Sequence, residues 1–307
     1  MPEVDYEKYL VREPLWEAGP GVRNRQSPTM TFMSSTQVPE ADYYIEFGWI
    51  YDIPEPNPHI HEHTHNFDEI VLHIGGDPDN PEDLGGEIEF YLGGQPLILT
   101  TTSGLFIPAG MSHGPLTWKK VTKTHIEMAI MLGTGSAMEG WANSGIKEAK
   151  KGLPVKTVDV DYEKYLVRKP NYEAGPGFKN RQSPTMTLMS SAQVPEANYY
   201  IELGWIYDVP EPNPGIHEHV HKFDEIVLHW GGNPEEPLDL GGEIEFYIGG
   251  QPLTFNTTTG LWVPKGIKHG PLTWKRFKRP HIEMAFMLNC GNMKEAWRDS
   301  GIRGPKA

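Results

Sequence analysis

Short runs in which hydrophobic and β-branched residues alternate with polar ones fill most of the chain, and glycine and proline separate them. The run 87–92 alternates strictly and ends at Gly93-Gly94, a pattern typical of a strand followed by a tight turn. Many short strands with such turns predict an all-β sandwich or small barrel. We expect strands at residues 43–52, 59–65, 69–74, 87–92, 95–102, 105–108 and 125–132, and a short helical stretch at 137–151.

This pattern occurs twice. A shift of 156 positions aligns the chain with itself, so that segments 5–12, 24–31 and 83–91 return in the second half, and the helical stretch returns at 292–301. A period this long indicates a duplicated domain and not a solenoid, whose repeats have roughly 20–50 residues. We predict domains at 1–156 and 157–307, with the boundary in the polar Gly/Pro segment 150–156. The arm 5–20 is expected to lie as a strap on a neighbouring domain.

Composition excludes several classes of partner. The chain has 27 Lys and Arg against 41 Asp and Glu, a net charge of -14, which argues against nucleic acid and anionic membranes. No apolar run approaches the ~20 residues of a membrane span, and the N-terminus lacks the features of a signal peptide. The single cysteine, Cys290, excludes an intrachain disulfide. We expect a cytoplasmic protein with a small-molecule substrate that could form a homo-oligomer through its N-terminal arms.

The chemistry is concentrated in a histidine-rich stretch. His61, His63 and His65 alternate and would share one face of a strand, and Glu69 has the same parity. His113 follows a Pro-x-Gly turn, and it is kept in the second copy although the residues around it change. Imidazole and carboxylate together suit Fe, Mn, Cu, Ni or Zn. The second copy repeats these candidates as His217, His219, His221, Glu225 and His269.

These residues carry a resemblance to the cupin superfamily, and their duplication resembles a bicupin. The family's His-x-His-x3-Glu-x6-Gly spacing is matched twice, and so is its Pro-x-Gly-x2-His spacing. The glycine that usually opens the first motif is Asn57 or Asn213 here, and the asparagine that closes the second is Thr117 or Thr273. These positions shape turns, so the departures concern loop geometry more than metal binding.

The resemblance implies two tandem double-stranded β-helix (jelly-roll) barrels, each with an interior metal held by three His and one Glu. It also implies a divalent transition metal, Fe(II) or Mn(II) first and Zn, Ni or Cu as alternatives, with up to two ions per chain. The implied ligands are His63, His65, Glu69 and His113 in the first copy and His219, His221, Glu225 and His269 in the second.

Several other residues are candidates for catalysis. His61 would lie at the pocket rim, and His73 would face inward, as a catalytic group or as a core histidine. Glu127 could form an acid–base pair with His125, or an ion pair on the outer face. With the second copy, the candidate catalytic residues are His61, His73, Glu127, His217, His229 and Glu283.

Two further positions bear on the substrate. Arg25, repeated as Arg181, could clamp a substrate carboxylate or form a salt bridge. His59 becomes Gly215 in the second copy, which indicates that it is dispensable.

The cupin fold carries many chemistries, so the reaction stays open. Our first hypothesis is a dioxygenase acting on a small phenolic, enolic or diketone substrate that chelates the metal. The first alternative is a Mn-dependent lyase, decarboxylase or isomerase on a small carboxylic acid, which would need Arg25 or another basic group near the metal. The second alternative is a non-catalytic metal-binding or small-molecule-binding protein, which a sealed apolar pocket would favour.

Overall fold

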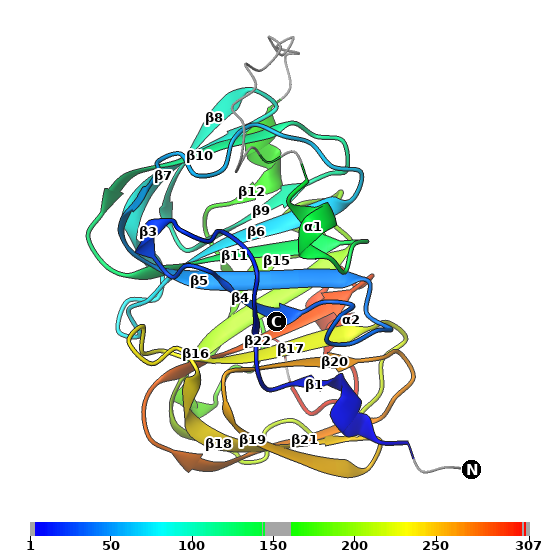
Figure 1. Ribbon diagram of the computed structural model, residues 1–307. Coiled ribbons are helices and arrows are strands. Elements are labelled where there is room, and N and C mark those ends of the chain that lie inside the picture. The colour runs from blue at the N-terminus through cyan, green and yellow to red at the C-terminus, as the bar shows by residue number, and fades with distance from the viewer. Residues whose placement is uncertain (1–3, 143, 145–160, 303, 305–307) are drawn as a thin grey trace. The chain divides into compact units, whose positions relative to one another are not determined.

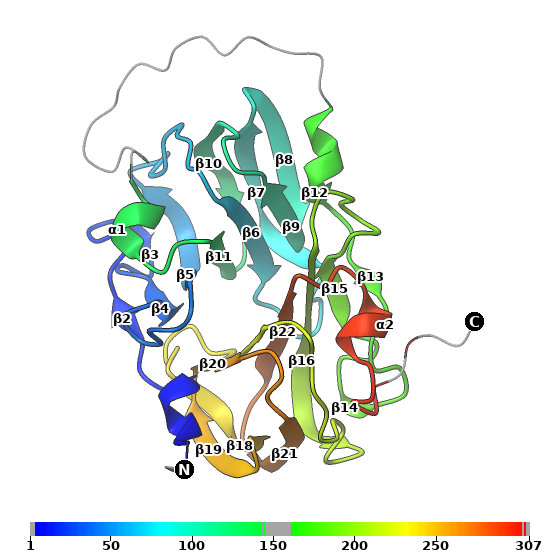
Figure 2. The same ribbon diagram turned by 90° about the vertical axis from the view of Figure 1, so that its right-hand side faces the viewer.

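The computed structural model describes residues 4–142, 144, 161–302 and 304. The chain is all-β and forms two compact units (Figures 1 and 2). We call Pro14–Lys169 the N-terminal barrel, and Met1–Glu13 with Pro170–Ala307 the C-terminal barrel. The predicted fold class, two jelly-roll barrels with short terminal helices, is confirmed.

The N-terminal barrel consists of a large sheet and a small one. The large sheet has the strand order β12-β9-β6-β11-β5-β4-β2, with β3 paired to β5, and the small sheet has the order β10-β7-β8. Its elements are β2 (Leu15–Trp16), β3 (Arg23–Arg25), β4 (Met30–Met33), β5 (Tyr43–Glu55), β6 (Asp68–Gly75), β7 (Asp83–Leu92), β8 (Gln95–Thr101), β9 (Ser103–Ile107), β10 (His113–Val121), β11 (His125–Leu132), α1 (Ala137–Gly140), η2 (Tyr162–Tyr165) and β12 (Leu166–Val167).

The C-terminal barrel repeats this arrangement. Its large sheet has the order β1-β20-β17-β22-β16-β15-β13, with β14 on β16, and its small sheet, β19-β18-β21, forms a separate layer (Figure 1). Its elements are η1 (Tyr6–Tyr9), β1 (Leu10–Val11), β13 (Asn171–Tyr172), β14 (Lys179–Arg181), β15 (Met186–Met189), β16 (Tyr199–Glu211), β17 (Glu225–Gly231), β18 (Asp239–Ile248), β19 (Gln251–Thr257), β20 (Thr259–Val263), β21 (His269–Phe277), β22 (His281–Leu288) and α2 (Met293–Ala296).

Alternation along the strands builds the barrel walls. In β7, Ile88, Phe90 and Leu92 are buried, while the residues between them are partly exposed. Full burial of each such side chain is worth roughly 1.5–3 kcal/mol relative to exposure. Trp49, Trp118, Trp205 and Trp274 are also buried.

Two strand predictions need correction. β5 continues through Pro54 to Glu55, because this part of the strand lies beyond the ladder with β11 and pairs only with β3. Proline is tolerated at such an edge, where its missing N–H is not needed. Segment 59–65 is not a strand, since only the isolated bridges Ile60↔Leu116 and His63↔His113 hold it.

The helices are shorter than predicted. α1 and α2 each span four residues and end before a tryptophan, Trp141 or Trp297, which adopts a non-helical conformation. The remainder of the predicted stretch 137–151 and the predicted domain boundary at 150–156 fall mostly or wholly outside the described residues.

The N-terminal arms are edge strands. β1 pairs antiparallel with β20, with Leu10 opposite Leu261, and β12 pairs with β9, with Leu166 opposite Leu105. Each arm therefore completes the barrel that it does not directly precede in sequence. This exchange is why the first thirteen residues belong to the same compact unit as Pro170–Ala307.

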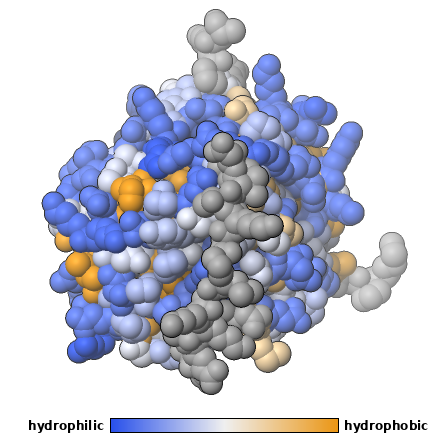
Figure 3. Space-filling model, turned by 90° about the horizontal axis from the view of Figure 1, so that it is seen from above, coloured by the Kyte–Doolittle hydropathy of each residue, from blue (hydrophilic) through white to orange (hydrophobic). Residues whose placement is uncertain are grey.

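The face drawn in Figure 3 is predominantly hydrophilic, with small and separate hydrophobic patches. Among the residues that the structure describes, no helix has the length and hydrophobicity to cross a membrane.

Two candidate metal centres and a cavity

In the N-terminal barrel, the candidate ligands come from three places that the fold brings together. His63 and His65 lie on the loop after β5, Glu69 begins the inward face of β6, and His113 opens β10. The loop is fixed to β10 by two backbone hydrogen bonds, from His63 N to His113 O (2.9 Å) and from His113 N to His63 O (3.0 Å). The four residues are therefore positioned by the backbone and not only by their side chains.

Two glycines allow this close approach. Gly110, in the Pro-x-Gly turn, has φ +80° and donates its N–H to His65 O at 2.7 Å. Gly114 has φ +86°, and a Cβ there would lie 2.6 Å from the carbonyl oxygen of His61. A larger residue at either position would strain the turn that presents His113.

Backbone carbonyls orient the three imidazole rings. Nδ1 of His63 lies 2.9 Å from His61 O, Nδ1 of His65 lies 2.7 Å from Phe67 O, and Nδ1 of His113 lies 2.9 Å from Met111 O. A carbonyl only accepts, so each Nδ1 carries the proton and donates it. The lone pair of each Nε2 is then left for a cation, as in histidines that bind metals.

These lone pairs converge on a carboxylate. Glu69 Oε2 lies 3.1 Å from Nε2 of both His65 and His113, and the ligand atoms of the three histidines all lie within 4.8 Å of one another. With neutral imidazoles, every one of these atoms is an acceptor, so a cation between them is needed to relieve their repulsion. The chemistry of this donor set fits a divalent transition metal.

The pKa values of Glu69 and His63 are consistent with a divalent metal at this centre. Burial alone would raise the pKa of Glu69, but the neighbouring imidazoles of His113 and His65 outweigh this effect and hold that pKa well below its usual range. Burial, reinforced by His113, lowers the pKa of His63 to about 4. His63 Nε2 is also buried with no hydrogen-bond partner among the described residues. At neutral pH Glu69 is therefore an anion and His63 a neutral imidazole.

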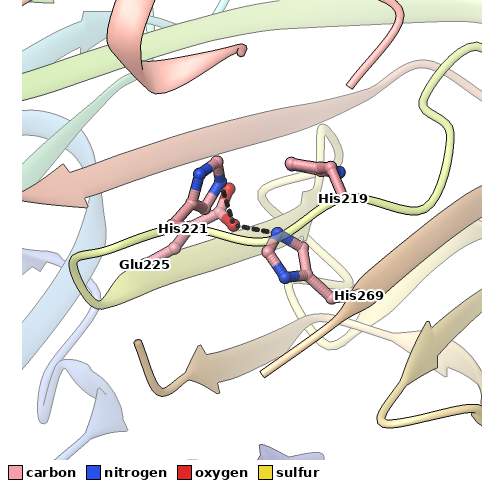
Figure 4. Close-up of side chains that lie close together, drawn as sticks. All are labelled: His219, His221, Glu225 and His269. Carbon is pink, nitrogen blue, oxygen red and sulfur yellow. Dashed lines mark ion pairs between the residues drawn. The ribbon is translucent and has the colours of Figure 1, made fainter. Parts of the chain in front are cut away.

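The C-terminal barrel repeats the centre. The ligand atoms of His219, His221, Glu225 and His269 all lie within 4.8 Å of one another, and all four residues are buried. Glu225 Oε2 lies 3.0 Å from His269 Nε2 and 3.5 Å from His221 Nε2 (Figure 4). Hydrogen bonds to these two histidines overcome the effect of burial and keep the pKa of Glu225 low. The chain thus offers two groups that fit up to two divalent metals.

A cavity of about 170 Å³ reaches the N-terminal centre. One water needs roughly 10–15 Å³ of such space, so the cavity has room for a small organic molecule. Its lining combines candidate metal ligands with other polar groups: His63, Glu69 and His113 with Arg25, Glu46, His59, His61 and Glu127.

Arg25, His59 and Glu127 form a buried polar cluster in this lining. Arg25 Nη1 lies 2.7 Å from His59 Nε2 and 3.5 Å from Glu127 Oε2. Burial would raise the pKa of Glu127, but the charge of Arg25 outweighs this effect and lowers that pKa to about 2. Glu127 therefore faces the cavity as an anion. It forms the ion pair that the sequence analysis gave as an alternative, but with Arg25 inside the barrel and not on the outer face.

Glu46 is a cavity residue that the sequence analysis missed. Tyr44 donates its hydroxyl to Glu46 Oε2 at 2.8 Å. Burial raises the pKa of Glu46 to about 7, and the hydrogen bond from Tyr44 and the charge of Arg25 only moderate the rise. The recurrence of this residue as Glu202, at an inward-facing strand position, was the available signal.

The remaining candidates have different positions. His61 lines the cavity, as a rim residue should. His73 is fully buried next to Trp118, at a ring distance of 6.0 Å, and is not part of the cavity lining. His229 is its counterpart, and the ring nitrogens of both lack hydrogen-bond partners within the described chain.

In the C-terminal barrel, Glu283 lines a pocket of only about 10 Å³, and His217 is not in that lining. His125 is not available as a proton-transfer partner for Glu127, because its Nε2 accepts from Trp118 Nε1 at 2.9 Å.

Two jelly-roll barrels in one chain, each with a histidine–glutamate centre inside, define the bicupin fold. The solved structures that share this fold with the chain include a variant of Bacillus subtilis oxalate decarboxylase, with a TM-score of 0.54, 10% identity, and 92% of this chain and 76% of that chain covered. They also include the formate complex of Lactobacillus farciminis oxalate decarboxylase, with a TM-score of 0.55, 11% identity, and coverage of 92% and 85%. No model of a known protein family matches the sequence, and neither does any curated protein. At these identities the likeness shows the fold.

Proposed function

We propose that the protein is a metal-dependent bicupin enzyme that acts on a small carboxylic acid as a decarboxylase or related lyase. The observation that supports this most is the composition of the N-terminal cavity, where Arg25 joins His63, Glu69 and His113 in one lining. The sequence analysis named a basic group near the metal as a requirement for a lyase or decarboxylase that acts on a small carboxylic acid. The shared fold with enzymes named as oxalate decarboxylases adds support.

A divalent metal bound by the histidine–glutamate group would supply a Lewis acid for a substrate carboxylate. Arg25 would bind a carboxylate of the substrate through charge-assisted hydrogen bonds. Glu127 and His59 hold the guanidinium in place, and the low pKa of Glu127 keeps it anionic and excludes it as a proton donor at neutral pH. Glu46, with a pKa of about 7, is the cavity carboxyl that can hold a proton.

Decarboxylation of this kind needs no net oxidant. One C–C bond breaks, its carboxylate leaves as CO₂, and the electron pair left on carbon takes up a proton to form a C–H bond. The dioxygenase hypothesis stays an unconfirmed prediction. The charged lining of the cavity does not favour the non-catalytic alternative, for which a sealed apolar pocket was expected.

The test supplies oxalate to protein loaded with Mn(II) and measures formate, CO₂ and oxygen consumption. We expect formate and CO₂ in equal amounts with no net oxygen uptake. Arg25→Ala should lower kcat/KM at least about 100-fold, because a charge-assisted contact in a buried site is lost. Arg23→Ala is the matched control, since Arg23 is exposed and pairs with Glu55 away from the cavity.

Oxygen uptake in proportion to a phenol or diketone, with no products from oxalate, would instead support the dioxygenase hypothesis and reject this proposal.

A further inference from the structure

The two barrels keep the same candidate ligands but differ at one pair of positions beside the conserved arginine. Val22 and His59 in the N-terminal barrel are replaced by Phe178 and Gly215 in the C-terminal barrel. Arg25 and Arg181, in contrast, are the same residue in the two copies, and so are Glu127 and Glu283. The exchange therefore changes the surroundings of an arginine–glutamate pair that is itself retained.

In the N-terminal barrel, His59 takes part in hydrogen bonding to the arginine. An arginine only donates, so His59 Nε2 accepts from Arg25 Nη1 at 2.7 Å and the ring carries its proton on Nδ1. His59 is 6% exposed, and its Nδ1 has no hydrogen-bond partner among the described residues. A buried donor of this kind needs an acceptor, and a ligand oxygen in the adjoining cavity could provide one.

In the C-terminal barrel, an aromatic ring takes the place of this imidazole. A Cβ added to Gly215 would lie 2.2 Å from Phe178 Cε1, so a histidine at 215 and a phenylalanine at 178 exclude each other. The guanidinium of Arg181 lies over the Phe178 ring at 5.3 Å from its centroid. The two positions are therefore sterically coupled, and the exchange replaces a polar partner of the arginine with an apolar one.

The described pockets next to the two arginines also differ in volume. The pocket beside Arg181 measures about 10 Å³, which is the volume of a single water, whereas the cavity beside Arg25 measures about 170 Å³. Ile302 and Trp297 form further walls of the smaller pocket, and the C-terminal candidate ligands are not in its lining.

We propose that this pair of positions makes the two sites unequal. The N-terminal barrel binds a small carboxylate, with Arg25 and His59 as its polar anchor. The C-terminal barrel holds a metal but does not take the same ligand, because Phe178 lies against Arg181 in place of the imidazole donor. The carboxylate class of the ligand rests on the proposed function, whereas the inequality of the barrels rests on the exchanged pair alone.

The experiment counts bound ligands and bound metals separately. Protein loaded with Mn(II) is titrated calorimetrically with oxalate, and metal content is measured by elemental analysis. We expect two metals but one oxalate per wild-type chain. In Val22→Phe/His59→Gly, oxalate binding should be lost while both metals stay. In Phe178→Val/Gly215→His, with Ile302→Ala added if needed to widen the pocket, a second oxalate should bind.

The matched control is Val121→Phe. It introduces the residue that the second copy has at this position, Phe277, and it lies outside the cavity lining. Val121→Phe should leave the numbers of bound oxalate and bound metal per chain unchanged. Far-ultraviolet circular dichroism of each variant, together with its retained metals, separates a folding defect from a loss of ligand binding.

Formate and catechol serve as second probes, so that the two proposals can fail separately. If catechol binds at one per chain and oxalate does not bind, the carboxylate assignment fails and the inequality stands. Equal binding of any probe to both barrels of the wild-type chain overturns the inequality. Retention of ligand binding by Val22→Phe/His59→Gly also overturns the inequality. Binding of none of the three probes contradicts both proposals.

Discussion

At the scale of single residues, the metal centre depends on which histidines point inward. His63 Nε2 is buried with no hydrogen-bond partner in the described part of the chain, while His61 contributes its backbone carbonyl to orient His63 and lines the cavity. We therefore expect His63→Ala to lower the metal content from two ions to one per chain, and His61→Ala to leave it at two. Elemental analysis after dialysis measures both. Retention of two ions by His63→Ala, with a loss in His61→Ala, would show that the ligand register is shifted.

The buried carboxyl of Glu46 predicts a pH dependence of stability. Its pKa is raised from 4.5 to about 7 in the folded state, so the folded protein binds more protons than the unfolded chain between these values. Stability from this group is thus fully present below about pH 4.5 and is lost as the pH rises towards 7. The stability of wild type relative to Glu46→Gln should fall by about 2.5 kcal/mol between pH 5 and pH 8.

Chemical denaturation of the two proteins at both pH values measures this difference. The histidines with lowered pKa values also make stability depend on pH, with the opposite sign in part of this range. Their contribution is the same in wild type and Glu46→Gln, so it cancels in the comparison. A difference that is constant with pH would mean that Glu46 ionises normally in the folded protein.

Residue by residue, sequence reasoning identified a set of candidate ligands that the fold brings together, because their spacing follows the backbone that presents them. It dismissed His59, since the second copy has glycine there. That inference assumed that the two copies have the same requirement, whereas Phe178 fills the space in one of them. It also passed over Glu46, because an acidic residue within an apolar strand gives no indication of what it faces across the barrel.

At the scale of elements, the exchanged arms are the feature with the largest expected effect. Leu10 in β1 and Leu166 in β12 are each 9% exposed, and each lies opposite a leucine of the strand next to the sheet edge. Replacing either with Asp should cost roughly 3 kcal/mol, from lost burial and an unpaired charge, and should uncover a strand edge.

Hydrogen exchange assigns the effect to a barrel. Leu10→Asp should reduce the protection of amides in β20 and leave β9 unchanged, and Leu166→Asp should do the reverse. Loss of protection in the strand of the other pair would contradict the observed pairing.

Strand predictions worked where alternation was strong, as in β7 and β8, and for the continuously buried strands β6 and β11. They failed where other constraints decide. The loop 59–65 alternates like a strand but lacks a continuous partner, since it meets β10 only at two isolated bridges. β10 itself was missed because its Gly114-Pro115 start has the sequence of a turn. Local pattern cannot tell which extended segment finds a neighbour in a barrel.

At the scale of the whole molecule, the two metal centres predict a dependence of stability on metal. Each centre brings together a carboxylate and imidazole lone pairs, whose repulsion a bound cation removes. Chelation with EDTA should lower Tm, and adding Mn(II) should restore it, with a shift that grows with the logarithm of free metal. Differential scanning calorimetry with and without His63→Ala measures this, since the variant should lose about half of the response. An unchanged Tm on chelation would mean that the groups bind no metal that stabilises the fold.

The reciprocal exchange of arms also bears on how the chain arose. A chain with a single repeat would carry an arm that this architecture places on a different barrel, so it would need a second copy of itself to complete its sheet. Such a chain would be a homodimer with swapped strands, and gene fusion would convert its concentration-dependent assembly into an intramolecular one. The two halves, produced as separate polypeptides, should accordingly complement each other as a one-to-one complex.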